Sequence, residues 1–425
     1  MNMNPSEKGW LKEYVDFRLE KLQELTTDAA RKRSHPEHSL YRIIQPTGLM
    51  YGQSIGVSGH PDQDTWHNRE KMKVLLAESL ISSSLLFYEK QNGTPIEITG
   101  AIERTLEHIG NFYNNIFPEL ATPAKPLFGK RKSPVEVVER ILDKRIERTI
   151  EFEGNFWTYF FHNSLLFLDV FIFGQWIHTN ADRIVADFFR YEREELRFSV
   201  VKVIAAASHA NKEVVYEEKK LLDFFLHSTD LSSEKRKEAV RIFEKGIEIS
   251  EINLPSENSW ILKKFFLEIA ILTIWADKRV EEMEMDFLKN LTLHLAFNED
   301  DLENSLIAIE GFVLENWEQL SYLQNNQDYQ QVSEQFIRRV AKIADKNKHR
   351  LLKELQENGE VVELLKKSRA TELTNEEKEK MRLALVQVLK SIPTFLIISL
   401  PRKFLTLPVL LKILPKSLFT EGITP

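Results

Sequence analysis

Two short acidic stretches carry the residues of this chain whose types and spacing could bind a metal ion. Asp277, Glu281 and Glu284 follow one another closely, and Asn211 and Glu218 occupy the places of Asp277 and Glu284 earlier in the sequence. Their carboxylate and amide oxygens suit hard divalent cations, but such cations take six or more oxygens and one loop offers two or three. The residues therefore predict weak binding of a divalent cation, mainly at Asp277 and Glu284.

The two stretches belong to an internal repeat with an offset of 66 residues. Each copy has an alanine, an Asn or Asp, a lysine and a valine, followed by a glutamate and a pair of apolar residues. Such a repeat predicts a supersecondary unit used twice, with loops 210–218 and 276–284 related by pseudo-twofold symmetry. An Asn or Asp also closes helix C-termini, where lysine suits the helix dipole, so loop closure is the alternative to metal binding.

The repeat resembles the TerB-like (tellurite-resistance) helical domain, whose signature is an alanine, an acidic residue and a later glutamate at this spacing. The resemblance implies a helical domain over residues 190–311 that binds divalent metal through these acidic residues. The chain departs from the signature at Asn211, which replaces an aspartate, and at Lys212 and Lys278, where glycine is usual. Asparagine lowers the charge of the ligands, and a lysine ammonium competes with a cation.

Composition and motifs argue against several classes of function. The 425 residues include no cysteine, which excludes disulfides, thiolate catalysis and zinc sites with sulfur ligands. The net charge of −7 gives no support to nucleic-acid binding. The sequence holds no glycine-rich phosphate loop, H-E-x-x-H or G-x-S-x-G motif. We therefore expect no enzyme, no catalytic residue, no nucleic-acid partner and no cofactor beyond a weakly bound cation.

Helix signals predict an all-α, multi-helix fold. Glycine is scarce, at 15 residues, and capping boxes at Asn4, Ser133 and Thr374 each predict the start of a helix. From these signals and from changes in composition we divide the chain into five segments. They are an N-terminal helical region at 1–117 with a glycine-rich loop at 45–60, an aromatic-rich helical hairpin at 133–189, the TerB-like domain at 190–311 with its duplicated helix–loop–helix, a charged helical region at 312–391 and an apolar, proline-broken C-terminal segment at 392–425.

The most aromatic stretch, residues 156–177, carries a polar stripe. Asn155, His162 and Asp169 are seven residues apart and so fall on one side of a helix. We interpret the stretch as a central buried helix whose polar side chains are satisfied by neighbouring helices. A proton path across a membrane is the alternative, because ionisable groups within membranes are usually functional.

The C-terminal segment has the length of a membrane span but not its composition. Residues 392–414 contain 14 Ile, Leu, Val or Phe side chains, together with Arg402, Lys403 and Lys412. Insertion of the apolar residues gains about 4 to 8 kcal/mol, whereas three central cations cost about 7 to 10 kcal/mol. Pro401 and Pro408 would also leave backbone groups unpaired in lipid. We expect short helices that pack on the protein, or that contact a membrane surface or a protein partner through Phe395, Leu396, Arg402, Lys403, Pro408, Leu410, Lys412, Pro415 and Lys416.

The same segment resembles the Letm family, transmembrane proteins of the inner mitochondrial membrane that have bacterial relatives. The matching residues are Ile392 to Phe395 and Leu407 to Pro415. The bacterial Letm-related biofilm-associated proteins are most similar. They share an opening stretch around Gly9-Trp10, a loop with Gly48 and Gly52, and a helix that has Asn163, Leu166, Phe167 and Asp169.

The resemblances imply three functions. The first is a non-enzymatic scaffold or adaptor, cytoplasmic and peripheral on the inner membrane, related to the biofilm-associated proteins. The second is cation/proton exchange or ion homeostasis, as in the mitochondrial relatives. The third is a stress-response module that binds divalent metal weakly, or a ribosome-binding protein. Homo-oligomer formation is left open.

Overall fold

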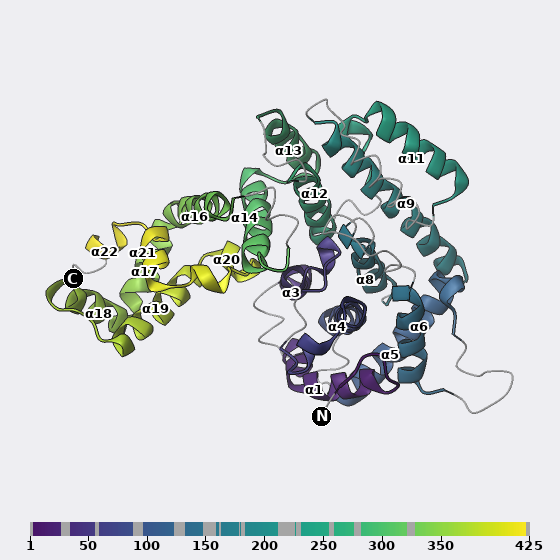
Figure 1. Ribbon diagram of the computed structural model, residues 1–425, viewed down its shortest axis with the longest axis horizontal. Helices are drawn as coiled ribbons and strands as arrows, with labels where there is room; N and C mark the ends of the chain where they lie inside the picture. Colours follow the sequence, from purple (N-terminus) through teal and green to yellow (C-terminus); the bar gives the residue numbers. More distant parts are fainter. Residues whose placement is uncertain are drawn as a thin grey trace. The chain divides into compact units, whose positions relative to one another are not determined.

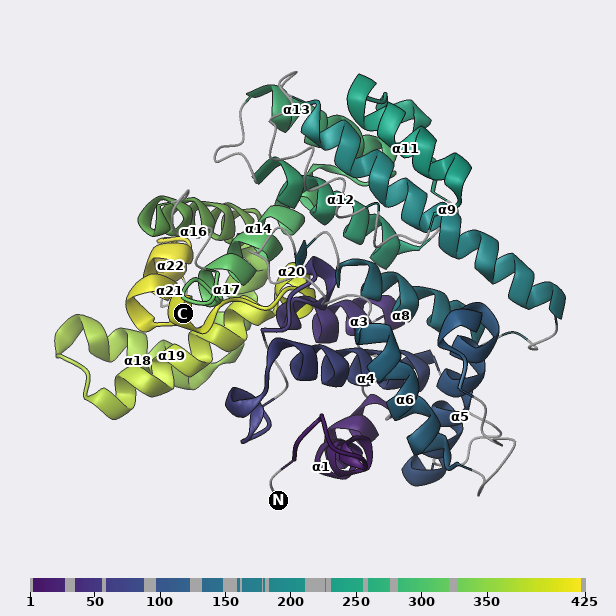
Figure 2. The same ribbon diagram turned by 45° about the vertical axis from the view of Figure 1, so that its right-hand side comes forward.

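The computed structural model is helical throughout the residues it describes, as expected from the sequence (Figures 1 and 2). Those residues are 3–26, 35–55, 59–87, 97–122, 132–147, 159–160, 163–177, 179, 183–210, 226, 231–254, 259–275, 282–320 and 328–421. The chain separates into two compact units, Met1–Leu295 (unit 1) and Ala296–Pro425 (unit 2). Helix α14 (Glu299–Glu315) belongs to unit 2, whereas on sequence grounds we group it with the TerB-like segment before it.

Unit 1 consists of α-helices joined by loops and short 3-10 turns. The helices are α1 (Trp10–Leu25), α3 (Pro36–Ile44), α4 (Asn68–Phe87), α5 (Ile98–Ile116), α6 (Pro134–Glu147), α8 (Leu165–Trp176), α9 (Arg183–Ser208), α11 (Ser233–Lys245), α12 (Trp260–Trp275) and α13 (Glu282–His294). The 3-10 turns are η1 (Gln45–Thr47), η2 (Leu49–Tyr51), η3 (Gln63–Thr65), η4 (Pro118–Leu120) and η5 (Ile249–Glu251).

The core of unit 1 contains α4, α8 and α12. Helices α8 and α12 are apolar on nearly every side, and a helix of that kind avoids contact with water. Almost every residue of both helices is buried. Helix α4 packs against α1, α3, α5, α6 and α8. Helix α9 packs against both α8 and α12 (Figure 1). Helix α8, which forms much of the aromatic stretch, is therefore an interior element of unit 1.

The first helix begins at Trp10, so the predicted start at Pro5 is wrong. Asn4 does accept a hydrogen bond from the Ser6 N–H (2.9 Å), but the chain then makes turns, and Gly9 adopts a left-handed conformation (φ 93°) that stops a helix from continuing through it. The Glu139 carboxylate of α6 accepts hydrogen bonds from the Gly9 and Leu11 N–H groups, both at 3.0 Å. A residue distant in sequence thus caps α1, and the sequence around Trp10 does not predict this contact.

The other two capping boxes are confirmed. Helix α6 begins at Pro134, with Ser133 and Glu136 exchanging hydrogen bonds through their side chains and backbone N–H groups. Helix α19 (Asn375–Lys390) begins after Thr374, which makes the same exchange with Glu377. In these cases the capping residues are local, so the sequence alone locates the start of the helix.

Unit 2 is a helical bundle that includes the C-terminal segment. Besides α14 and α19 it comprises α16 (Tyr329–Lys346), α17 (Lys348–Glu357), α18 (Gly359–Ala370), α20 (Pro393–Ile397), η6 (Arg402–Phe404), α21 (Leu407–Ile413) and α22 (Leu418–Glu421). Helix α21 packs on α16 and α19, α20 on α19, and α22 on α17 (Figures 1 and 2). Within the described part of the chain, no helix is long and apolar enough to cross a membrane.

The glycine-rich loop of unit 1 is held against the start of the aromatic stretch. Gly52 has a φ of 67°, and a Cβ atom there would lie 2.2 Å from the Tyr159 carbonyl oxygen. The Asn163 side-chain amide donates a hydrogen bond to the Gly52 carbonyl (3.3 Å). Only glycine allows both this backbone conformation and this close approach of two backbone segments.

The substitution Gly52→Ala is expected to destabilise the protein more than Gly59→Ala. Both glycines have positive φ values, but nothing lies within 4 Å of a Cβ placed on Gly59. The two variants share the backbone strain of about 1–2 kcal/mol, and the steric clash adds a further loss only at Gly52. Urea unfolding of the two variants measures the difference, and equal losses in the free energy of unfolding would contradict the close approach.

Candidate functional site

The structure describes few of the residues predicted to bind a cation. Asn211, Glu218, Asp277 and Glu281 lie outside the described residues, as do most of the two repeat loops. Glu284 lies on α13 and is 3% exposed. Among the described residues, no group of three or more His, Asp or Glu side chains is placed to hold a metal ion. The cation site and the pseudo-twofold relation of the loops stay predictions.

Asp169, from the polar stripe of the aromatic stretch, is paired inside unit 1. The Arg145 Nε donates a hydrogen bond to its Oδ2 (2.6 Å), and the Tyr113 hydroxyl donates another (3.1 Å). Burial raises the pKa of Tyr113 well above its usual value, so this hydroxyl stays protonated as a donor. Asn155 and His162 lie outside the described residues. For Asp169, neighbouring helices supply the partners, as the buried-helix interpretation predicts.

Glu268 is a second buried carboxylate, which the sequence analysis missed. The Tyr41 and Tyr51 hydroxyls donate hydrogen bonds to its two oxygens, at 2.6 and 2.7 Å. The Lys264 ammonium, one helical turn away, lies 3.7 Å from Oε1. The sequence signal that could have identified this carboxylate is that Glu268 is the one acidic residue in the largely apolar sequence of α12. This cluster attaches α3 and the glycine-rich loop to α12, which is a structural role.

The predicted contact residues of the C-terminal segment divide into buried and exposed groups. Phe395 and Leu410 are buried inside unit 2 and contribute to its core. Pro415 is half-buried. The remaining predicted residues are exposed, namely Leu396, Arg402, Lys403, Pro408, Lys412 and Lys416. The structure thus leaves the cations and a few apolar side chains of the segment at the surface.

Helix α21 shows this division most clearly. Leu410 and Ile413, together with Leu414 directly after the helix, face the bundle, and Leu410 is 0% exposed. Leu411, the next residue, is 39% exposed, and its neighbours on the same side of the helix are Pro408 and Lys412. Of the four cations in the segment, Lys403 lies 3.7 Å from the Glu318 carboxylate. Among the described residues, no carboxylate pairs with the Lys412 or Lys416 side chain.

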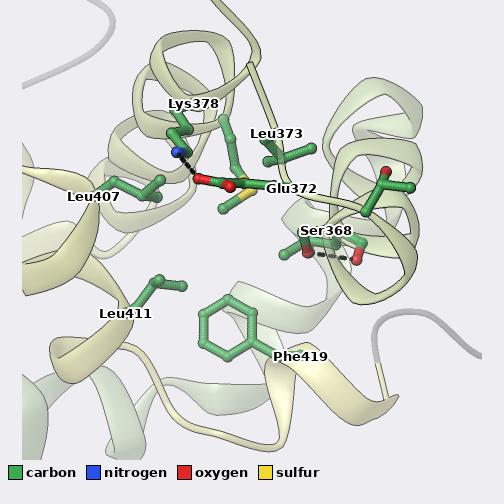
Figure 3. Close-up of a pocket in the computed structure, with 10 residues that line it drawn as sticks. Ser368, Glu372, Leu373, Lys378, Leu407, Leu411 and Phe419 are labelled. Atoms are coloured by element: carbon green, nitrogen blue, oxygen red, sulfur yellow. Dashed lines mark hydrogen bonds and ion pairs between the residues drawn. The ribbon is translucent and has the colours of Figure 1, made fainter. Parts of the chain in front are cut away.

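A groove of about 490 Å³ lies between the C-terminal segment and helices α18 and α19 (Figure 3). Most of its lining is apolar. The apolar side chains are Leu365, Leu373, Met381, Leu407, Leu411 and Phe419. At its edge the Lys378 ammonium and the Glu372 carboxylate form an ion pair at 3.0 Å, and Ser368 donates a hydrogen bond to the Leu365 carbonyl (2.8 Å). The groove is open, and its apolar lining comes both from the C-terminal segment and from the helical body of unit 2.

Glu310 connects helices α14 and α16 in the same unit as the C-terminal segment. It lies buried on α14, and the Arg339 Nε of α16 donates a hydrogen bond to its Oε1 (3.0 Å), while a second Arg339 nitrogen reaches Glu303 (2.7 Å). Burial raises the pKa of Glu310 to about 7, and Arg339 opposes this shift only in part. The α14–α16 contact therefore includes a carboxyl group that titrates near neutral pH.

Comparison of the chain with family models, curated proteins and solved structures finds no match. The Letm-like and TerB-like resemblances therefore rest on the sequence motifs alone.

The stabilising contribution of Glu310 is expected to fall as the pH rises from about 5 to 7. In this range the folded protein keeps a proton on Glu310 that the unfolded chain releases near pH 4.5, so folding is weakened by up to about 1.4 kcal/mol per pH unit. Urea unfolding of wild type and of Glu310→Gln at several pH values measures this, because glutamine does not titrate. A difference between the two proteins that stays constant over this range would contradict the raised pKa.

Proposed function

We propose that the protein is a non-enzymatic helical scaffold or adaptor, and that its C-terminal segment holds it reversibly at an anionic membrane surface. The observation that carries the proposal is the two-sided α21, which buries Leu410 and Ile413 and presents Leu411 and Lys412 outward. The resemblance of this segment to Letm-related biofilm-associated proteins agrees with such a role.

Electrostatics favour binding to anionic lipid. Each lysine or arginine near an anionic surface contributes about 1 kcal/mol, so Arg402, Lys412 and Lys416 together contribute about 3 kcal/mol. Lys403 contributes less, because the Glu318 carboxylate lies 3.7 Å from it. Partial burial of the exposed Leu396 and Leu411 adds to this gain. The protein as a whole carries a charge of −7, so the attraction depends on these local cations and weakens as salt screens them. We therefore expect salt-sensitive binding at the surface of the membrane.

Charge reversal at Lys412 and Lys416 is expected to release the protein from anionic vesicles. The two exposed lysines supply about 2 kcal/mol of attraction, so replacing both with glutamate lowers the affinity by roughly thirtyfold or more. Co-sedimentation with vesicles of phosphatidylglycerol and phosphatidylcholine at low and high salt measures the effect.

The matched control is Lys12→Glu with Lys237→Glu, at two exposed lysines of unit 1. It changes the net charge by the same amount, so it separates the location of the cations from the charge of the whole protein. Equal release of both double variants, or wild-type binding that is insensitive to salt, would refute a specific role for the C-terminal segment.

A further inference from the structure

We propose that Glu318 restrains membrane binding by the C-terminal segment through an autoinhibitory contact with Lys403. The contact joins the turn that follows α14 to η6, and it offsets one of the cations that the segment presents to anionic lipid. This inference rests on the proposed function, because it names how binding at that same surface is regulated.

Two carboxylates at the end of α14 lie against η6. The Glu315 Oε2 accepts a hydrogen bond from the Arg402 backbone N–H (2.9 Å), and the Glu318 Oε1 lies 3.7 Å from the Lys403 ammonium. Glu315 therefore fixes the start of η6 beside α14, while Glu318 supplies the negative charge that lies beside the next side chain of the turn.

Buried neighbours keep η6 in this position. Pro401 and Phe404, the residues on either side of the two cations, are both buried. The Phe404 ring centroid lies 4.9 Å from that of Phe336 on α16, and Pro401 packs so closely on Gly311 that a Cβ atom added there would lie 3.4 Å from the proline ring. The backbone of η6 leaves α14 only if these contacts break, so the carboxylate stays beside the cation when a membrane approaches.

The contact weakens the attraction of η6 to lipid phosphates, while α21 has no such restraint. The distance of 3.7 Å is well below the Debye length of about 10 Å at 0.1 M salt, so salt screens this contact less than the attraction of lipid charges farther away. A lipid phosphate that binds Lys403 must therefore compete with Glu318. Lys412 and Lys416 meet no such competition, because no carboxylate of the described residues pairs with either side chain. Glu318 thus raises the content of anionic lipid that a membrane needs before the segment binds.

The test is Glu318→Gln in the full-length protein, a change that removes the charge and keeps the size of the side chain. Lys403 then acts without its competitor, so we expect the affinity for vesicles of phosphatidylglycerol and phosphatidylcholine to rise about fivefold, which corresponds to the contribution of about 1 kcal/mol from one lysine at an anionic surface. Binding should also begin at a lower fraction of phosphatidylglycerol. Because the Glu318 side chain is 87% exposed, the variant should keep the helical content of wild type, which circular dichroism checks.

A double-mutant cycle shows whether the effect passes through this pair. In a Lys403→Gln background, the substitution Glu318→Gln should raise the affinity much less than it does in wild type, because the cation that the carboxylate offsets is gone. The matched control is Glu20→Gln, at an exposed glutamate of α1, which changes the net charge by the same amount and should bind like wild type.

The outcomes separate this restraint from the membrane role itself. Wild-type affinity in Glu318→Gln, an equal gain in Glu20→Gln, or an undiminished gain in the Lys403→Gln background would overturn the restraint while leaving salt-sensitive vesicle binding by wild type intact. Absence of vesicle binding by both wild type and Glu318→Gln would instead remove the proposed membrane role, and the restraint with it.

Discussion

The constraint on which unit 2 depends is the conflict between the apolar composition of its C-terminal segment and the prolines and cations that interrupt it. Water disfavours 14 large apolar side chains within residues 392–414, and lipid disfavours the three cations and the backbone groups that the prolines leave unpaired. Folding back in short helices resolves both problems. Each buried residue such as Leu410, Ile413 or Leu414 contributes about 1.5 to 3 kcal/mol, while the cations keep their hydration at the surface.

Buried carboxylates hold the helices of both units in place. Glu268 and Asp169 in unit 1 each accept hydrogen bonds from a tyrosine, and a buried basic residue lies beside each one. Glu310 in unit 2 plays a corresponding part with Arg339. Removing one partner from such a group leaves the other uncompensated, which costs far more than an exposed ion pair contributes. The contacts of Tyr41 with Glu268, Arg145 with Asp169 and Arg339 with Glu310 therefore link different helices of each unit.

Sequence patterns predicted the features of this chain that depend on local physics. Scarce glycine and capping boxes predicted the all-α fold, and the capping residues at Ser133 and Thr374 located two helix starts. The start of α1 was missed because its cap, Glu139, comes from another helix. The groove was missed for the same kind of reason, since Leu373, Met381 and Leu411 meet only after the C-terminal segment has folded onto α18 and α19. For the C-terminal segment, the sequence predicted one set of contact residues, and the fold separates buried Phe395 and Leu410 from the exposed cations of that set.

Cysteine accessibility along α21 tests the central claim most directly, because the chain contains no cysteine of its own. The variants Leu410→Cys and Leu411→Cys place a thiol at neighbouring positions that are 0% and 39% exposed. In solution, the account predicts fast maleimide labelling at position 411 and slow labelling at 410, with anionic vesicles slowing the reaction at 411 only. Equal labelling of the two variants in solution, or no effect of anionic vesicles on position 411, would contradict a segment that packs one side on unit 2 and offers the other to a membrane.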